Sequence, residues 1–174
     1  MQHDCNPRIF NRNLDGNEQG LEVHFPELNF EEKDLSEMGL AYARISVFDH
    51  WLSAVEAKSS PLMSYSIALA AGKLDDYLAG EHKLLDPYRM LGHHGSICSY
   101  PRPFRKFDTV DVKREKILMD SLREKHLMDV YFMDFGIRVM GGYDRTDLLI
   151  AESPSELELL LSHVSQFGLF ILPN

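Results

Sequence analysis

The last third of the chain consists of short apolar runs separated by turn residues, and this pattern constrains the fold most. Residues 128–133 (MDVYFM) and 137–143 (IRVMGGY) have strand-like composition, with 134–136 (DFG) between them. Arg145–Thr146 then turns the chain into 147–151 (DLLIA). Short strands joined by such brief connections usually pair with their neighbours in sequence. The pattern therefore predicts an antiparallel meander.

A helix and one more strand are expected after the meander. Residues 153–156 (SPSE) have the composition of a helix start. The apolar face of this helix contains Leu157, Leu160, Leu161 and Val164. Gly168 ends the helix, and Leu169–Leu172 is predicted to form a last strand beside the meander.

Apolar residues at spacings of three and four predict helices in the first two thirds. The first helix covers 30–57, with a capping box at Asn29 and Glu32. Its apolar face contains Leu35, Met38, Tyr42, Ile45, Phe48, Leu52 and Val55. A second helix begins at Ser60–Pro61 and ends at Gly80. A third covers 110–126 and begins at a cap on Asp108 or Thr109.

Two further regions are expected to have little regular structure. Residues 82–91 have the pattern of a short helix interrupted by Pro87, and 92–103 (GHHGSICSYPRP) are predicted to form a loop. Residues 1–20 have the composition of a flexible N-terminal arm, and Leu21–Phe25 that of a short strand. We therefore expect one α+β domain over 21–174, with N-terminal helices packed on a small, mainly antiparallel C-terminal sheet.

The cysteine content and the N-terminus indicate a cytoplasmic protein. Cys5 and Cys98 are the two cysteines, too few for a disulfide-stabilised secreted domain, so free thiols are expected. Residues 1–10 contain no apolar run typical of a secretion signal. The most apolar longer stretch, 61–71, is too short to cross a bilayer core of about 30 Å. No membrane association is therefore expected.

Charge is unevenly distributed along the chain. The net charge is −9, which argues against nucleic acid as the main partner because its phosphates require cations. Residues 1–101 contain 15 acidic and 8 basic groups, and 126–174 contain 7 acidic and 2 basic groups. Residues 102–125 instead contain 5 acidic and 8 basic groups. An acidic protein with one basic segment suggests a partner whose surface is itself charged, most simply a basic protein.

The leading hypothesis is a non-enzymatic, acidic protein-binding module. A concrete form is an immunity-type protein that neutralises a basic, nuclease-like toxin by mimicking the charge of nucleic acid. We predict that its contact residues are exposed acids, and that it has no catalytic residue, metal site or cofactor. The predicted contacts are Glu31, Glu32, Asp75, Asp76, Asp144 and Asp147.

Two alternatives remain open. A small hydrolase or metal-dependent enzyme could be centred on His93, His94 and Cys98, because histidine and cysteine ligate zinc and form nucleophile–base pairs. A phospholigand or nucleic-acid binder could use the basic band, which is interleaved with Tyr100, Phe104 and Phe107. We define the basic band as Arg102, Arg105, Lys106, Lys113, Arg114 and Lys116. The single tryptophan, Trp51, is interpreted as a core residue.

Overall fold

The computed structural model describes residue 25, residues 32–109 and residues 111–173. The predicted arm and nearly all of the predicted strand 21–25 lie outside these residues. In chain order the elements are α2 (Glu32–Glu37), β1 (Ala41–Ser46), α3 (Ala54–Ser59), α4 (Tyr65–Ala70), α5 (Leu74–Leu91), β2 (Ser96–Tyr100), β3 (Arg105–Phe107), α6 (Val112–Leu122), β4 (Asp129–Phe132), β5 (Ile137–Met140), β6 (Thr146–Ala151), α7 (Pro154–Val164), a 3-10 turn (Ser165–Phe167) and β7 (Phe170–Leu172).

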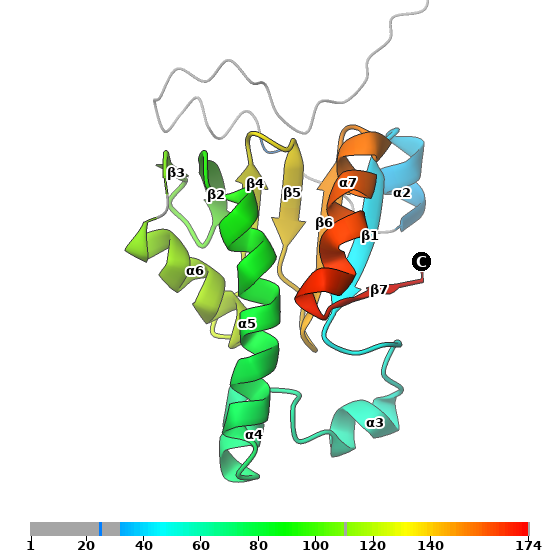
Figure 1. Cartoon of the computed structure of the whole chain (residues 1–174), viewed down its shortest axis with the longest axis vertical. Helices are drawn as coiled ribbons and strands as arrows, with labels where there is room; N and C mark the ends of the chain where they lie inside the picture. The colour runs from blue at the N-terminus through cyan, green and yellow to red at the C-terminus, as the bar shows by residue number, and fades with distance from the viewer. Residues whose placement is uncertain (1–24, 26–31, 110, 174) are drawn as a thin grey trace, which may run out of the picture.

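The strands form a single antiparallel sheet in the order β3-β2-β4-β5-β6-β1-β7. The predicted meander is confirmed as β4, β5 and β6, which pair in sequence order with Phe132 opposite Ile137 and Met140 opposite Leu148. In Figure 1, α5, α6 and α7 lie in front of this sheet. The α+β fold class is therefore confirmed.

The main hydrophobic core lies between the sheet and these three helices. Alternate residues of the central strands point into it, including Val130 and Phe132 of β4 and Val139 of β5. They meet apolar side chains of α5, α6 and α7, namely Leu84, Leu85, Leu91, Ile117, Leu118, Leu122, Leu157, Leu160 and Val164. Because side chains alternate across a strand, the neighbouring residues of each strand face the opposite side of the sheet.

A smaller apolar cluster covers part of that opposite side. Its buried members are Leu35, Leu40, Ile97, Phe104, Tyr131 and Ile150. Leu35 comes from α2, so this short helix covers one end of the second face. Met140 and Leu148 pack against this second cluster and also line the cleft described below.

The predicted helix over 30–57 is wrong. Helix α2 ends after one and a half turns, because Gly39 takes a left-handed φ of 72°. The Gly39 N–H donates to Ser36 O at 3.0 Å, and the Leu40 N–H donates to Leu35 O at 3.0 Å. This pair of bonds is a Schellman motif, which stops a helix. Residues 41–46 then form β1, because their period-two alternation lets them pair with β6 and β7.

The predicted helix over 60–80 is divided in two. Ser64, not Ser60, caps α4, and Gly72 ends it with a φ of 68°. Gly80 does not end a helix but lies within α5, which continues through Pro87 to Leu91. The Arg145 guanidinium packs against Gly80, where a Cβ atom would collide with it. Close approach, rather than helix termination, explains this glycine.

Three further boundaries differ from those expected. The predicted loop 92–103 contains β2, which pairs with β4 and carries the sheet beyond the meander. Helix α6 begins at Val112 behind an Asp111 cap, and not behind Asp108 or Thr109. The last strand, β7, pairs with β1 rather than with the meander, because β1 lies between them.

Candidate functional site

The six predicted acidic contacts do not form one surface. Glu31 lies outside the described residues, and Glu32 begins α2. Asp75 and Asp76 are exposed in the first turn of α5. Figure 1 shows α2 and this end of α5 at opposite ends of the fold. A single partner surface could therefore include only a subset of the six.

Asp147 is buried, contrary to the expectation that it lies exposed in a turn. It belongs to β6, its side chain faces α5, and it is 1% exposed. The Tyr88 hydroxyl donates a hydrogen bond to Asp147 Oδ2, and the Gly142 N–H donates to Oδ1 at 3.0 Å. Burial is the main cause that raises the Asp147 pKa to about 6. The carboxyl holds the β5–β6 loop, and it cannot contact a partner from this position.

The β5–β6 loop, residues 141–145, has an unusual backbone. Asp144 and Arg145 have φ values of 54° and 60°, a left-handed region that non-glycine residues rarely adopt. The Arg145 side chain is 4% exposed and donates to Tyr77 O at 2.9 Å. Its guanidinium also lies 4.2 Å from the centre of the Tyr77 ring. The buried arginine anchors the loop to α5 and thereby fixes this backbone.

Glu124 meets the loop from the other side. Glu124 follows α6 and has a φ of 55°. Together with Asp144 and Arg145 it completes the set of non-glycine residues with positive φ in the described part of the chain, and all three lie where the segment after α6 meets the β5–β6 loop. Glu124 Oε1 accepts a hydrogen bond from the Asp144 N–H at 3.3 Å. Sequence reasoning missed Glu124, because it is 20 residues from Asp144 and has no local motif.

Both carboxyls of this junction are destabilised in their charged form. Burial raises the pKa of Asp144, and it raises the pKa of Glu124 together with the Asp144 charge. Within the described residues, neither carboxyl forms an ion pair with a lysine or arginine side chain, although the charge of the nearby Arg145 lowers the Glu124 pKa in part. We call Glu124 and Asp144 the carboxyl pair.

A cleft of about 370 Å³ is lined in part by Asp144 of the carboxyl pair, while Glu124 is not among its lining residues. Its floor crosses three neighbouring strands, since Leu148 lies opposite both Met140 and Arg44. Trp51 and Tyr143 supply aromatic walls. The complete lining is Arg44, Trp51, Leu127, Met140, Gly141, Gly142, Tyr143, Asp144, Thr146 and Leu148. A concave, mainly apolar site with a few polar groups is the usual form of a binding site.

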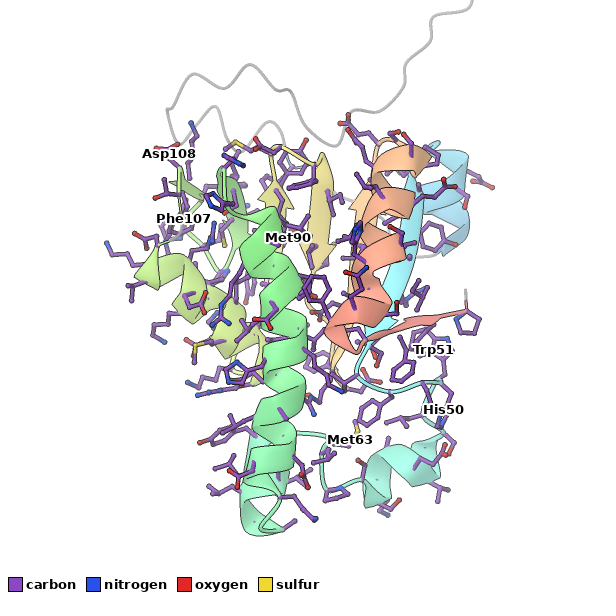
Figure 2. All side chains as sticks on the ribbon, in the orientation of Figure 1. His50, Trp51, Met63, Met90, Phe107 and Asp108 are labelled. Atoms are coloured by element: carbon purple, nitrogen blue, oxygen red, sulfur yellow. The ribbon has the colours of Figure 1, made fainter. Side chains whose placement is uncertain are left out.

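Trp51 is a wall of this cleft and not a core residue, which corrects its interpretation. Its side chain is 43% exposed, and Figure 2 shows it just below β7. The indole N–H donates to Pro173 O at 2.8 Å, and the Arg44 guanidinium lies 5.5 Å from the ring. These contacts fix the ring at the lower end of the sheet without burying it.

A second depression of about 430 Å³ lies on the other side of Glu124. It is lined by Ser64, Tyr65, Ser66, Arg123, Glu124 and Lys125. Arg123 forms two 2.7 Å hydrogen bonds with Glu81, and Lys125 lies 2.8 Å from Asp120. Both cations are already paired, so they do not neutralise Glu124.

The geometry does not support an activated thiol in the His93, His94 and Cys98 group. Cys98 is fully buried in the main core, its Sγ donates to Tyr100 O, and burial raises its pKa to about 12. His93 and His94 are exposed, with ring centres 4.8 Å apart. The described residues contain no group of three histidine, cysteine or acidic side chains placed to hold a metal.

The basic band is only partly available to a ligand. Arg114 is fully buried, while Lys106 pairs with Asp108 at 3.2 Å and Lys116 pairs with Asp120. Phe104 and Phe107 are buried in the two apolar clusters and so cannot stack on bases. The band lies along β3 and α6, at the opposite edge of the sheet from β7.

No protein-family model, curated protein or solved structure matches the chain. Among the described residues, none of the helices has both the length and the apolar composition needed to span a membrane.

Proposed function

We propose that this protein is a non-enzymatic, acidic protein-binding module whose partner presents a basic surface. The supporting observation is the carboxyl pair, two half-buried acids whose pKa values are raised by burial; Asp144 lines an aromatic-walled cleft, and Glu124 accepts a hydrogen bond from the Asp144 N–H. A lysine or arginine side chain of the partner would enter the cleft and neutralise them.

The electrostatics of the carboxyl pair favour such an occupant. Burial destabilises the charged form of a carboxyl. A cation that approaches the carboxyl stabilises this charged form and lowers the pKa. Aromatic rings also attract cations through their electron-rich faces. In the cleft, the Arg44 guanidinium already lies over the Trp51 ring, so Tyr143 supplies the ring and Asp144 supplies the charge for a further cation. The cleft is therefore complementary to a cationic side chain with an apolar stem.

The charge of the surrounding chain supports the same partner. Residues 146–174, which include α7 and β7, contain no lysine or arginine, and besides the buried Asp147 they contain the acids Glu152, Glu156 and Glu158. Asp49 and Glu56 lie beside Trp51 in sequence, and both contact the exposed His50. Although Arg44 lies opposite Leu172 and Lys83 lies close to Gly168, the net charge of −9 favours encounter with a basic partner. Neutralisation of a basic, nuclease-like toxin by an immunity-type protein is one concrete form of the proposal.

The test is the affinity of a cationic probe for variants that remove the carboxyl pair. The probe is a capped peptide in which arginine alternates with valine. We expect Glu124→Gln combined with Asp144→Asn to weaken its binding about tenfold, which corresponds to a loss of about 1.4 kcal/mol. Wild-type affinity should also fall as salt rises, because screening weakens charge attraction.

The matched control removes the same number of negative charges, two, at another predicted contact. Asp75→Asn combined with Asp76→Asn removes two exposed carboxylates from the start of α5. An affinity loss confined to this control would place the contact on α5 and contradict the cleft. Binding that ignores salt, or no binding of the probe, would contradict the proposed function itself.

A further inference from the structure

We propose that the free edge of β7 pairs with an extended segment of the basic partner, which adds a strand to the sheet. This inference rests on the proposed function and specifies how the partner binds. Within the described residues β7 pairs with β1 alone, so its other edge offers unpaired backbone groups. Addition of a peptide strand to such an edge is a common mode of recognition.

The two edges of the sheet differ in how they are protected. Native edge strands usually have charged residues or prolines that prevent pairing with other chains. At the β3 edge, Arg105 and Lys106 lie in the strand and Pro103 lies just before it. In contrast, β7 contains the uncharged residues Phe170, Ile171 and Leu172. The β7 edge therefore lacks charged residues that would oppose pairing.

The side chains of β7 are exposed despite being apolar. Phe170 is 43% exposed and Ile171 is 48% exposed. In an antiparallel strand these neighbours face opposite sides of the sheet, so an added strand could cover both. Exposed apolar side chains on a strand edge are typical of a binding surface.

Charge and position select the occupant of this edge. A second copy of this chain would have the same net charge of −9, and repulsion between like-charged molecules would oppose the contact. The edge is also continuous with the cleft, because Leu172 lies opposite Arg44 and Trp51 donates to Pro173 O. An extended basic segment can therefore pair with β7 and place a cationic side chain at the cleft.

The length of β7 explains why both contacts are needed. A three-residue strand, followed by Pro173, offers few backbone hydrogen bonds. Each such bond contributes only about 1 kcal/mol net. Strand addition alone would be weak, and the carboxyl pair would supply the remaining affinity and the preference for cations.

The experiment is hydrogen exchange of the full chain, measured by NMR with and without the saturating arginine–valine probe. We expect exchange of the outward-pointing amides within 170–172 to slow at least about tenfold, since pairing protects them. Ile171→Lys should weaken probe binding about tenfold, because a charged edge opposes pairing. Val112→Lys, an equal charge change on exposed α6, should leave the affinity within about twofold.

The outcomes separate this inference from the proposed function. Salt-dependent probe binding without protection of 170–172 would overturn strand addition and leave the cleft contact standing. Equal affinity losses in Ile171→Lys and Val112→Lys would also overturn it, because overall charge would then explain both. Absence of probe binding would overturn the proposed function and strand addition together.

Discussion

At the scale of single residues, Asp147 shows how a buried carboxyl supports the candidate site without forming part of its surface. Its hydrogen-bond partners are the Tyr88 hydroxyl and the Gly142 N–H, and neither is a cation. Both hydrogen bonds favour the charged carboxylate, but burial outweighs them, so the folded protein favours the protonated carboxyl and its pKa rises to about 6. Since Gly142 lines the cleft, the protonation of Asp147 is linked to the loop that forms the cleft wall.

This carboxyl should make stability depend on pH. The folded protein keeps the Asp147 proton to a higher pH than the unfolded chain, in which the pKa is about 3.9. The free energy of unfolding should therefore fall as pH rises from about 4 to about 7, and a shift of roughly two units corresponds to about 3 kcal/mol. Asp147→Asn should remove this contribution, as urea unfolding at several pH values would show.

The comparison with Asp147→Asn isolates the residue from other titrating groups. The stability of the variant relative to the wild type should increase across that pH interval. For Asp75→Asn, at an exposed position, the stability relative to the wild type should change far less across the same pH interval. A difference between wild type and Asp147→Asn that stays constant with pH would contradict a proton-binding Asp147.

The buried Arg114 side chain packs directly against Gly92. Arg114 is fully buried in α6, and its Nη1 donates to Gly92 O at the end of α5. A cation at the C-terminal end of a helix is favoured by the helix dipole. A Cβ atom on Gly92 would collide with the Arg114 guanidinium. The glycine is therefore required by the buried side chain.

The two residues can be tested by a double-mutant cycle in urea unfolding. Gly92→Ala should destabilise the protein by about 1–3 kcal/mol, because the added methyl group overpacks the site. In an Arg114→Met background the same substitution should cost much less. Additive free-energy changes in the double variant would contradict a direct steric coupling.

At the scale of elements, α3 differs from the other helices. It has no buried residue, and its start is held by a capping box in which Ser53 and Glu56 satisfy each other's backbone N–H groups. Figure 1 shows it set apart from the sheet. Helical stability in proteins comes mainly from tertiary packing, which α3 lacks.

We therefore expect α3 to open locally far more often than the sheet does. Its amides should exchange with solvent at least about 100-fold faster than those of β4 and β5, which lie in the centre of the sheet. Native-state hydrogen exchange would measure this directly. Equal protection of α3 and the central strands would show that α3 unfolds only with the whole protein.

The elements also show what the sequence could predict. The meander and α7 were predictable because their signals are local: apolar runs with short turns, and a serine–proline start before an apolar face. The prediction of a helix over 30–57 failed because residues 41–46 fit a helical spacing as well as a strand. Pairing with β6 and β7, distant in sequence, decides the outcome.

The candidate site was less predictable than the fold. Asp144 was found from its turn, but Glu124, Trp51 and Arg44 reach the same place from other elements. Asp147 was misplaced because its position in the polar segment 144–147 suggested a solvated turn. Burial under Tyr88 depends on the packing of α5 against the sheet, which no local pattern contains.

At the scale of the whole molecule, the two edges of the sheet differ in charge: β3 is basic, whereas β7 is uncharged and Arg44 of β1 lies opposite its Leu172. The basic band lies along β3 and α6, whereas residues 146–174, including β7 and α7, have no lysine or arginine. A basic partner should therefore approach from the β7 side, where the cleft also lies. This orientation connects the charge of the chain, the carboxyl pair and the free strand edge.

The central claim is that the carboxyl pair binds a cationic group, and NMR titration of the two side-chain carboxyls tests it most directly. In the free protein both pKa values should lie above their ordinary range, because burial opposes ionisation. With the arginine–valine probe bound, both should fall, and the affinity of the probe should rise with pH across the same interval. Carboxyl pKa values that the bound probe leaves unchanged would contradict the claim.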